Sequence, residues 1–161
     1  EDQIIVTTKK GQSIRFKEKD ARAMGRAAAG TRAIRLKKGD EAVGMDVVSE
    51  NQKANLKNHN EVDYLLILTE NGYGKRTHLK EYRVQTRGGS GIKTANITQK
   101  TGNLVYAKVL SGEEEDLIVI SRKGQVIRTA IADIAKISRS TQGVRIMRLD
   151  EGDKVVSAAS F

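Results

Sequence analysis

The sequence of 161 residues contains no cysteine, no proline and no tryptophan, and only four tyrosines and two phenylalanines. Without cysteine it can form neither a disulfide framework nor a zinc site with thiolate ligands. Its longest apolar runs, at 65–68 and 117–120, are far too short to cross a membrane. The scarcity of aromatic side chains argues against a platform on which single-stranded bases stack. The chain begins at Glu1 without a methionine, so we expect it to be part of a longer protein.

Positive charge is what the sequence has in excess. Lysine and arginine number 29 against 20 acidic residues, for a net charge of +9. Residues 1–48 carry eleven basic and seven acidic side chains, residues 63–110 carry eight and three, and residues 111–161 carry eight of each. A basic surface attracts polyanions, of which nucleic acid and anionic lipid are the common cases. The excess therefore indicates a polyanionic partner for the first two thirds of the chain.

Three segments of the chain repeat one pattern of residues. Each has an apolar run, a glycine, an arginine four residues after it, a second arginine eleven residues later and a further glycine four residues beyond. The first landmarks of the three copies are Gly11, Gly72 and Gly124. Every landmark recurs at spacings of 61 and then 52 residues. Agreement of independent landmarks over two intervals indicates a true internal repeat.

Each repeat is predicted to consist of short β-strands. Glycine between two apolar runs supplies the positive φ of a tight hairpin, so strands should flank Gly11, Gly72 and Gly124. Further strands are predicted at 31–36, 92–97 and 144–149, and at 42–45, 104–107 and 155–158. Short helical turns are expected near 17–24, 79–83 and 131–137. Repeats of about 50 residues with four strands are typical of propeller blades, so we predict an all-β, propeller-like fold of three blades.

The repeat also defines a domain organisation. We predict blades at 1–48, 63–110 and 111–161. The polar stretch 49–62, rich in asparagine, is predicted to be an exposed loop between the first two blades.

A cation at the same place in every blade would form a row along the rim of the fold. Such a row suits a bent duplex, because each blade can contact successive phosphates. The alternative is that each arginine pairs with a carboxylate or caps backbone carbonyls within its own blade. The residues that we predict to contact DNA are Arg15, Arg26, Arg32, Lys75, Arg76, Arg87, Arg128, Arg139 and Arg145.

The stretch 85–91 is the most glycine-rich part of the sequence. Gly88 and Gly89 would let the backbone approach a phosphate and expose its amides, with Arg87 supplying charge. The alternative is a mobile connector. The order of residues after Gly91 does not match a Walker phosphate loop.

No catalytic constellation is visible in the sequence. The two histidines, His59 and His78, lie in different segments, and no serine or threonine is marked as a nucleophile beside a base. The acidic run 113–116 lacks the alternating ligand spacing of a calcium loop. We therefore expect no enzymatic activity, no metal and no cofactor in this chain.

Four short motifs resemble the C-terminal domain of DNA gyrase A subunits. They are YGKRT at 73–77, RAMG at 22–25, GVR at 143–145 and DEGDKVV at 150–156. The resemblance implies a β-pinwheel, a propeller-like disc whose neighbouring blades exchange strands. In that family the disc wraps double-stranded DNA around its basic perimeter and supports negative supercoiling. It also implies a bacterial, cytoplasmic and nucleoid-associated protein, whose partners are the rest of the gyrase A subunit and the gyrase B subunit.

The sequence departs from the family pattern in two ways. The family disc usually has six blades, whereas this chain has three, which are most similar to the last three. The family box QRRGGKG belongs to the first blade. Residues 85–91 resemble it, but Thr86 and Ser90 replace two of its cations. The catalytic tyrosine of the family lies outside this chain.

Two further readings remain open. The chain also resembles the related A subunit of topoisomerase IV, and a propeller with a basic rim can instead dock on an acidic protein. Because a three-blade arc exposes strand edges at both ends, we expect either an open arc or two chains that pair to close a six-bladed disc.

Overall fold

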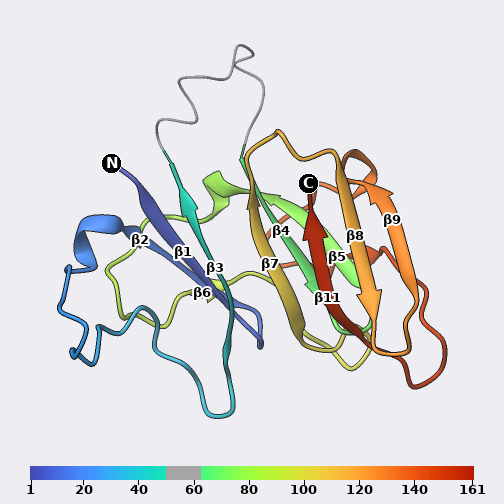
Figure 1. Cartoon of the computed structure of the whole chain (residues 1–161), viewed down its shortest axis with the longest axis horizontal. Helices are drawn as coiled ribbons and strands as arrows, with labels where there is room; N and C mark the ends of the chain where they lie inside the picture. The colour runs from blue at the N-terminus through green and yellow to red at the C-terminus, as the bar shows by residue number, and fades with distance from the viewer. Residues whose placement is uncertain (50–62) are drawn as a thin grey trace.

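The computed structural model describes residues 1–49 and 63–161, and its regular structure is entirely strands and three-residue 3-10 helices (Figure 1). Apart from Ser49, the residues of the predicted polar loop 49–62 lie outside the described part of the chain. The helices are η1 (Glu18–Asp20), η2 (Leu79–Glu81) and η3 (Ile131–Asp133). The strands are β1 (Gln3–Thr8), β2 (Gln12–Lys17), β3 (Ala42–Val48), β4 (Tyr64–Thr69), β5 (Tyr73–His78), β6 (Ile92–Lys93), β7 (Leu104–Leu110), β8 (Asp116–Ser121), β9 (Val126–Ala130), β10 (Val144–Arg145) and β11 (Val155–Ser160).

The hairpins form where the glycines predict them. Gly11, Gly72 and Gly124 have φ angles of 81°, 82° and 87°, in the left-handed region that favours glycine. They join three antiparallel pairs, β1 with β2, β4 with β5, and β8 with β9. The predicted strands at 42–45, 104–107 and 155–158 are β3, β7 and β11, each longer than predicted.

The strands form three sheets, which confirms the all-β, propeller-like fold. Their orders are β3-β1-β2-β6, then β10-β5-β4-β7, then β11-β8-β9. In each of the first two sheets one edge strand comes from the next repeat. The second repeat supplies β6 to the first sheet, and the third repeat supplies β10 to the second. The strand exchange that the family resemblance implies is therefore present at both boundaries.

Two sequence-based expectations need correction. The strands predicted at 92–97 and 144–149 shrink to the two-residue β6 and β10, and 31–36 contains no strand. These segments become strands only where they pair with the second strand of the preceding repeat, and no repeat precedes 31–36 among the described residues. The third sheet likewise has three strands in place of four, because no described repeat follows to pair with β9. The helical turns are also shorter than predicted.

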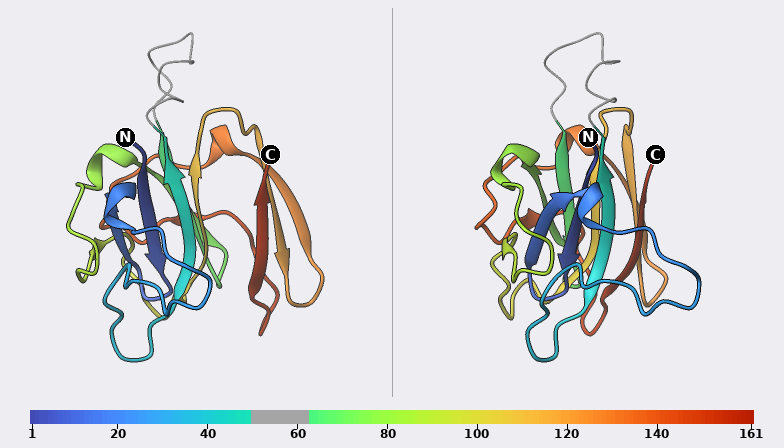
Figure 2. Two further views of the ribbon diagram at one scale, coloured as in Figure 1. Left: turned by 60° about the vertical axis from the view of Figure 1, so that its left-hand side comes forward. Right: turned by 90° about the vertical axis from the view of Figure 1, so that its left-hand side faces the viewer.

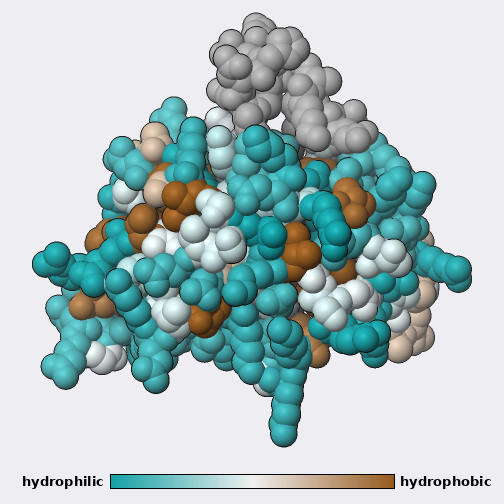
Figure 3. All heavy atoms as spheres, turned by 180° about the vertical axis from the view of Figure 1, so that it is seen from behind, coloured by the Kyte–Doolittle hydropathy of each residue, from teal (hydrophilic) through white to brown (hydrophobic). Residues whose placement is uncertain are grey.

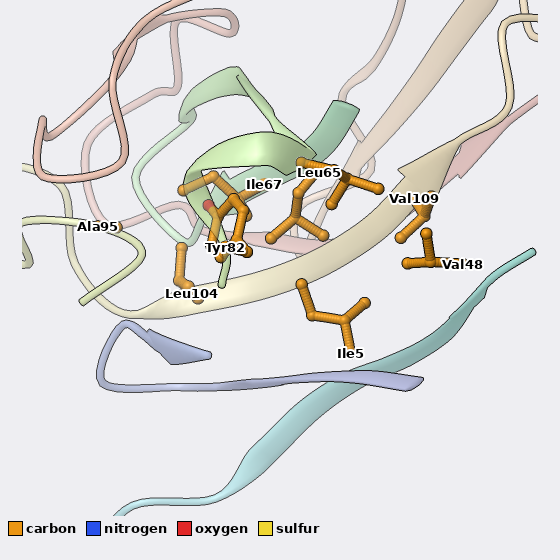
Figure 4. Close-up of a cluster of buried hydrophobic side chains, with 9 residues drawn as sticks. Ile5, Val48, Leu65, Ile67, Tyr82, Ala95, Leu104 and Val109 are labelled. Carbon is orange, nitrogen blue, oxygen red and sulfur yellow. The ribbon is translucent and has the colours of Figure 1, made fainter. Parts of the chain in front are cut away.

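The hydrophobic core lies between consecutive sheets. Strand β4 belongs to the middle sheet and is buried on both faces, which explains its continuous apolar run. Leu65 and Ile67 pack toward the first sheet, in the cluster shown in Figure 4, which Ile5 and Val48 complete from β1 and β3. Side chains of the opposite face of β4 pack with the third sheet. Packing against neighbours thus stabilises each sheet, and the first repeat has in addition a small cluster of its own, formed by Val6, Ile14, Phe16 and Ile34.

The three sheets stand side by side along an arc (Figure 2). Strands β3, β7 and β11 lie next to one another, one from each repeat, and form the inner side of the arc. The exchanged strands β6 and β10 occupy the opposite, outer edges. Since every helix in 1–49 and 63–161 is a single turn, none could span a membrane.

Candidate nucleic-acid interface

The exchanged strands carry a repeated cation on the outer edge of the arc. Lys93 lies opposite Gln12 in the pairing of β6 with β2, and Arg145 lies opposite Tyr73 in the pairing of β10 with β5. Arg32 occupies the same place in the first repeat, 61 residues before Lys93. All three side chains are exposed. We call Arg32, Lys93 and Arg145 the outer cation row.

Sequence reasoning named Arg32 and Arg145 but missed Lys93. The signal was available, because Lys93 stands at the repeat spacings of 61 and 52 residues from the other two. The repeat was defined by its arginines and glycines, whereas this position of the repeat accepts either cation.

A different row lies inside the fold. Arg15 is 9% exposed and donates through Nη1 to the carbonyl oxygens of Leu79, at 2.9 Å, and Tyr82, at 3.2 Å. Arg76 is 8% exposed and donates to those of Ala132 and Ile134, both at 2.9 Å. Burial lowers the pKa of both guanidinium groups. These arginines cap carbonyls of the next blade, so each fastens one repeat to the following one.

Arg128 is the third member of that row, but its surroundings differ. Its side chain is 65% exposed, and its Nε donates to Asp116 Oδ2 at 3.0 Å. The hydrogen bond to this carboxylate raises the pKa of Arg128. The guanidinium also lies 5.4 Å from the centre of the Phe161 ring. Within the described residues, this position of the repeat is therefore buried where another repeat is packed against it and exposed in the third repeat.

In the second and third repeats, the second arginine lies at the boundary with the preceding repeat. Arg87 donates to the carbonyl oxygens of Asp20, at 2.7 Å, and Arg32, at 2.5 Å. Arg139 donates to that of Lys93, which is the equivalent of Arg32. Arg26, in the first repeat, is exposed, and no hydrogen bond or ion pair holds its side chain among the described residues. Arg87 and Arg139 are half-buried and keep part of their charge at the surface.

Lys75 is fully buried at the boundary of the second and third repeats. Its Nζ donates to the carbonyl oxygens of Ser138, Arg139 and Thr141, each at 2.8 Å. Burial lowers its pKa to about 8, against the attraction of the Glu81 carboxylate. Because its ammonium group donates to carbonyls of the third repeat, Lys75 holds the second repeat against the third.

The glycine-rich stretch lies against the first repeat. Gly88, with a φ of 82°, donates its amide to the carbonyl of Ala33 at 2.8 Å. Gly89 accepts from the amide of Arg35 at the same distance. These hydrogen bonds use the Gly88 amide within the fold. The stretch is thus an ordered connection between the first two repeats.

A cationic groove opens beside Tyr73 on the outer edge of the second sheet. It has a volume of about 340 Å³, and its lining includes the cations Lys100, Arg145 and Arg148 together with the carboxylates of Asp150 and Asp153. Lys100 Nζ lies 5.5 Å from the centre of the Tyr73 ring, and the Arg145 guanidinium lies 5.6 Å from it. Arg145 also donates to the Tyr73 hydroxyl at 3.0 Å. None of these three cations forms an ion pair with a carboxylate of the described residues.

The rest of the surface is compatible with a polar partner. The face in Figure 3 is mostly hydrophilic, and its apolar patches are small and separate. No three side chains of histidine, aspartate or glutamate come together as metal ligands within 1–49 and 63–161. His78 ends β5, and its Nδ1 accepts a hydrogen bond from the Lys80 amide.

Comparison with known proteins decides the family. The sequence profile described as DNA gyrase C-terminal domain, beta-propeller, matches residues 2–49, 63–111 and 115–161. The chain belongs to the DNA gyrase C-terminal domain family. It is 43% identical over 160 residues to the DNA gyrase A subunit of Staphylococcus aureus strain MRSA252, in a match that covers 99% of this chain. It spans only 17% of that relative's length.

Solved structures of C-terminal domains have the same fold as this chain. A structure of a DNA gyrase A C-terminal domain matches with a TM-score of 0.84 and 28% identity, over 99% of this chain and 50% of that one. The C-terminal domain of a DNA topoisomerase IV matches with a TM-score of 0.83 and 20% identity, over 99% and 46%. The second likeness concerns the fold alone.

The buried arginines make a prediction about stability. Replacing Arg76 with alanine leaves the carbonyls of Ala132 and Ile134 without their donor, so Arg76→Ala should lower the free energy of unfolding by about 1–3 kcal/mol. Arg148 is exposed and serves as a matched control. Arg148→Ala should change the free energy of unfolding by less than about 0.5 kcal/mol. Urea unfolding measures both. Equal losses in the two variants would contradict the fastening role of Arg76.

Lys75 makes a prediction about pH. Its folded-state pKa of about 8 lies below the ordinary 10.5. Between these values the unfolded chain binds a proton that the folded chain has released, so this group makes stability rise with pH. Lys75→Met removes the group, and the free energy of unfolding of wild type minus that of the variant should increase from pH 8 to pH 10. A difference that stays constant or falls would show that the pKa is not lowered.

Proposed function

We propose that this chain is the non-catalytic, DNA-wrapping module of a gyrase A subunit. The observation that carries the proposal is the outer cation row, one exposed cation in each repeat, two of them on exchanged strands at the outer edge of a sheet. Duplex DNA that follows this edge meets a new cation at each repeat. In the cytoplasm, the chain then supports negative supercoiling in concert with the gyrase B subunit, joined by the rest of the gyrase A subunit.

Phosphate contacts are the physical basis of the proposed binding. Each lysine or arginine that neutralises a phosphate releases condensed counterions, which favours binding without any preference for sequence. Bending 20–30 bp of duplex through 40–90° costs on the order of 1–6 kcal/mol, so several contacts are needed to offset it. A curved row of cations supplies them in succession.

The cationic groove adds contacts beside the outer cation row. Lys100 and Arg148 are exposed and flank Arg145, so a phosphate near Tyr73 would meet three cations. Arg26 adds an exposed cation in the first repeat, and Arg87 and Arg139 add half-buried ones near the strand exchange. Arg128 is exposed, although it is paired with Asp116.

Three of the cations predicted from sequence are left out of the proposed surface, as are Gly88 and Gly89, which contact the first repeat. Arg15, Arg76 and Lys75 are buried and donate to backbone carbonyls of the next repeat. In the proposal they hold the blades in the curved arrangement that positions the outer cations. Their contribution to DNA binding is indirect.

Salt dependence tests the proposal. Engagement of about six phosphates predicts that log affinity for duplex DNA falls with log salt concentration with a slope of about −5. The triple variant Arg32→Ala, Lys93→Ala, Arg145→Ala should make this slope shallower by about 3. Fluorescence anisotropy of a labelled duplex at several salt concentrations measures it.

The control is a triple variant that loses the same amount of positive charge at three positions away from the proposed surface. Lys9, Lys19 and Lys108 each form an ion pair with a glutamate and lie outside the outer cation row. Replacing these three with alanine should leave the slope nearly unchanged. A wild-type slope near −1, or equal effects of the two triple variants, would reject the proposed surface.

A further inference from the structure

A cavity of about 500 Å³ lies at the boundary between the second and third repeats. The second repeat lines it with Tyr64, Arg76 and Leu110, and the third repeat with the loop before β8, the end of β9, part of η3 and Lys136. None of its lining residues belongs to the outer cation row. Cavities of about 300–1,000 Å³ are typical of sites that enclose small molecules. A ligand in this cavity would contact two repeats at once.

Part of the lining is apolar. Leu110 and Ile131 are each 4% exposed and belong to the buried cluster between the second and third sheets. The methyl group of Ala130 and the ring of Tyr64 extend this apolar surface within the cavity. An apolar surface of this kind stabilises the organic body of a ligand and gives nothing to a bare ion.

Two cations lie around the ring of Tyr64 in the same cavity. The Arg76 guanidinium lies 5.6 Å from the centre of the ring, and Lys136 Nζ lies 5.1 Å from it. Arg76 is only 8% exposed, and its Nε and Nη2 donate to carbonyls of the third repeat. Its Nη1 has no acceptor among the described residues. One donor of a buried guanidinium is therefore left for a ligand.

The charge of these two cations is not neutralised by an ion pair. Neither Arg76 nor Lys136 lies within ion-pair distance of a carboxylate in residues 1–49 and 63–161. The Asp133 carboxylate favours the charged form of Arg76, but only from beyond that distance. The Tyr64 hydroxyl likewise has no hydrogen-bond partner in the described chain. Together these groups attract an acceptor with a negative charge.

Three carboxylates also line the cavity, and two of them are occupied. Glu114 accepts from the amide and the hydroxyl of Ser111, at 3.0 and 3.2 Å, and Asp116 accepts from Arg128. Glu115 is exposed, and no described side chain forms a hydrogen bond or an ion pair with it. Its charge opposes a ligand that has more than one negative group. The lining therefore selects against anions of high charge.

We propose that this cavity binds a small amphipathic carboxylate, that is, an organic molecule with an apolar body and one negative charge. The carboxylate accepts from Arg76 Nη1, Lys136 Nζ and the Tyr64 hydroxyl. The apolar body covers Leu110 and Ile131. The two cations give charge-assisted hydrogen bonds, which are shorter and stronger than bonds between neutral groups.

Such a ligand holds the second repeat against the third. It contacts residues of both repeats, so it binds the folded chain and not the unfolded one, and its binding raises the stability of the fold. The site is separate from the outer cation row and from the groove beside Tyr73. The proposal therefore does not rest on the binding of DNA, and its test uses none.

Four probes with a phenyl group and different charges test the class of ligand. Phenylacetate should shift the amide signals of Ala132 and Lys136 in two-dimensional NMR, with a dissociation constant of about 1 mM. Phenethyl alcohol, phenethylamine and phenylmalonate should bind at least about tenfold more weakly. No shift up to the solubility of phenylacetate would overturn the proposed site. Equal or tighter binding of any of the other three would overturn the preference for a single carboxylate.

Variants locate the bound carboxylate. Lys136 is exposed, so Lys136→Ala should leave the fold intact and weaken the binding of phenylacetate by about tenfold. Lys100→Ala is the matched control, because Lys100 Nζ lies 5.5 Å from the ring of Tyr73 in a different groove. This control should leave the binding unchanged. Equal effects of the two variants, or no effect of Lys136→Ala, would overturn the assignment of the cavity.

Discussion

The structure depends on how each repeat is joined to the next. Two of the three buried clusters lie between neighbouring sheets, so the middle sheet packs against both of the others. The third cluster lies within the first repeat. Two contacts make up the joint at each boundary. The following repeat supplies a strand to the sheet of the preceding repeat, and a buried arginine of the preceding repeat donates to carbonyls of the following one. A buried donor with two carbonyl acceptors is directional, so it fixes the angle between blades as well as holding them together. The curvature of the arc follows from repeating this joint.

The same joint determines which cations are available to a ligand. Arg15 and Arg76 are buried in the joint and are not accessible to DNA at the outer edge. The strand that the following repeat supplies has an exposed cation instead, Lys93 or Arg145. One structural device thus buries one row of positive charge and presents another at the outer edge. This arrangement places the outer cations on the side away from β3, β7 and β11.

Much of the fold could be predicted from the sequence. The hairpin glycines and apolar runs identify nine of the eleven strands, because local turn chemistry and burial decide them. The residue pattern also predicts strands where β6 and β10 lie, but it makes them too long. Their pairing with another repeat could be predicted only through the family resemblance. The roles of the arginines could not be predicted from register alone. Arg76 and Arg128 occupy one position of the repeat, and only the presence of a following repeat buries the first.

The central claim is that a curved row of outer cations bends duplex DNA. The most direct test is fluorescence transfer between the labelled ends of a duplex of about 100–150 bp, which is within one persistence length, so that the free duplex keeps its ends apart. Titration with this chain at low salt should bring the ends together and increase the transfer, and added salt should release them steeply. Saturated binding with unchanged transfer would contradict the claim, because the outer cations would then hold DNA without bending it.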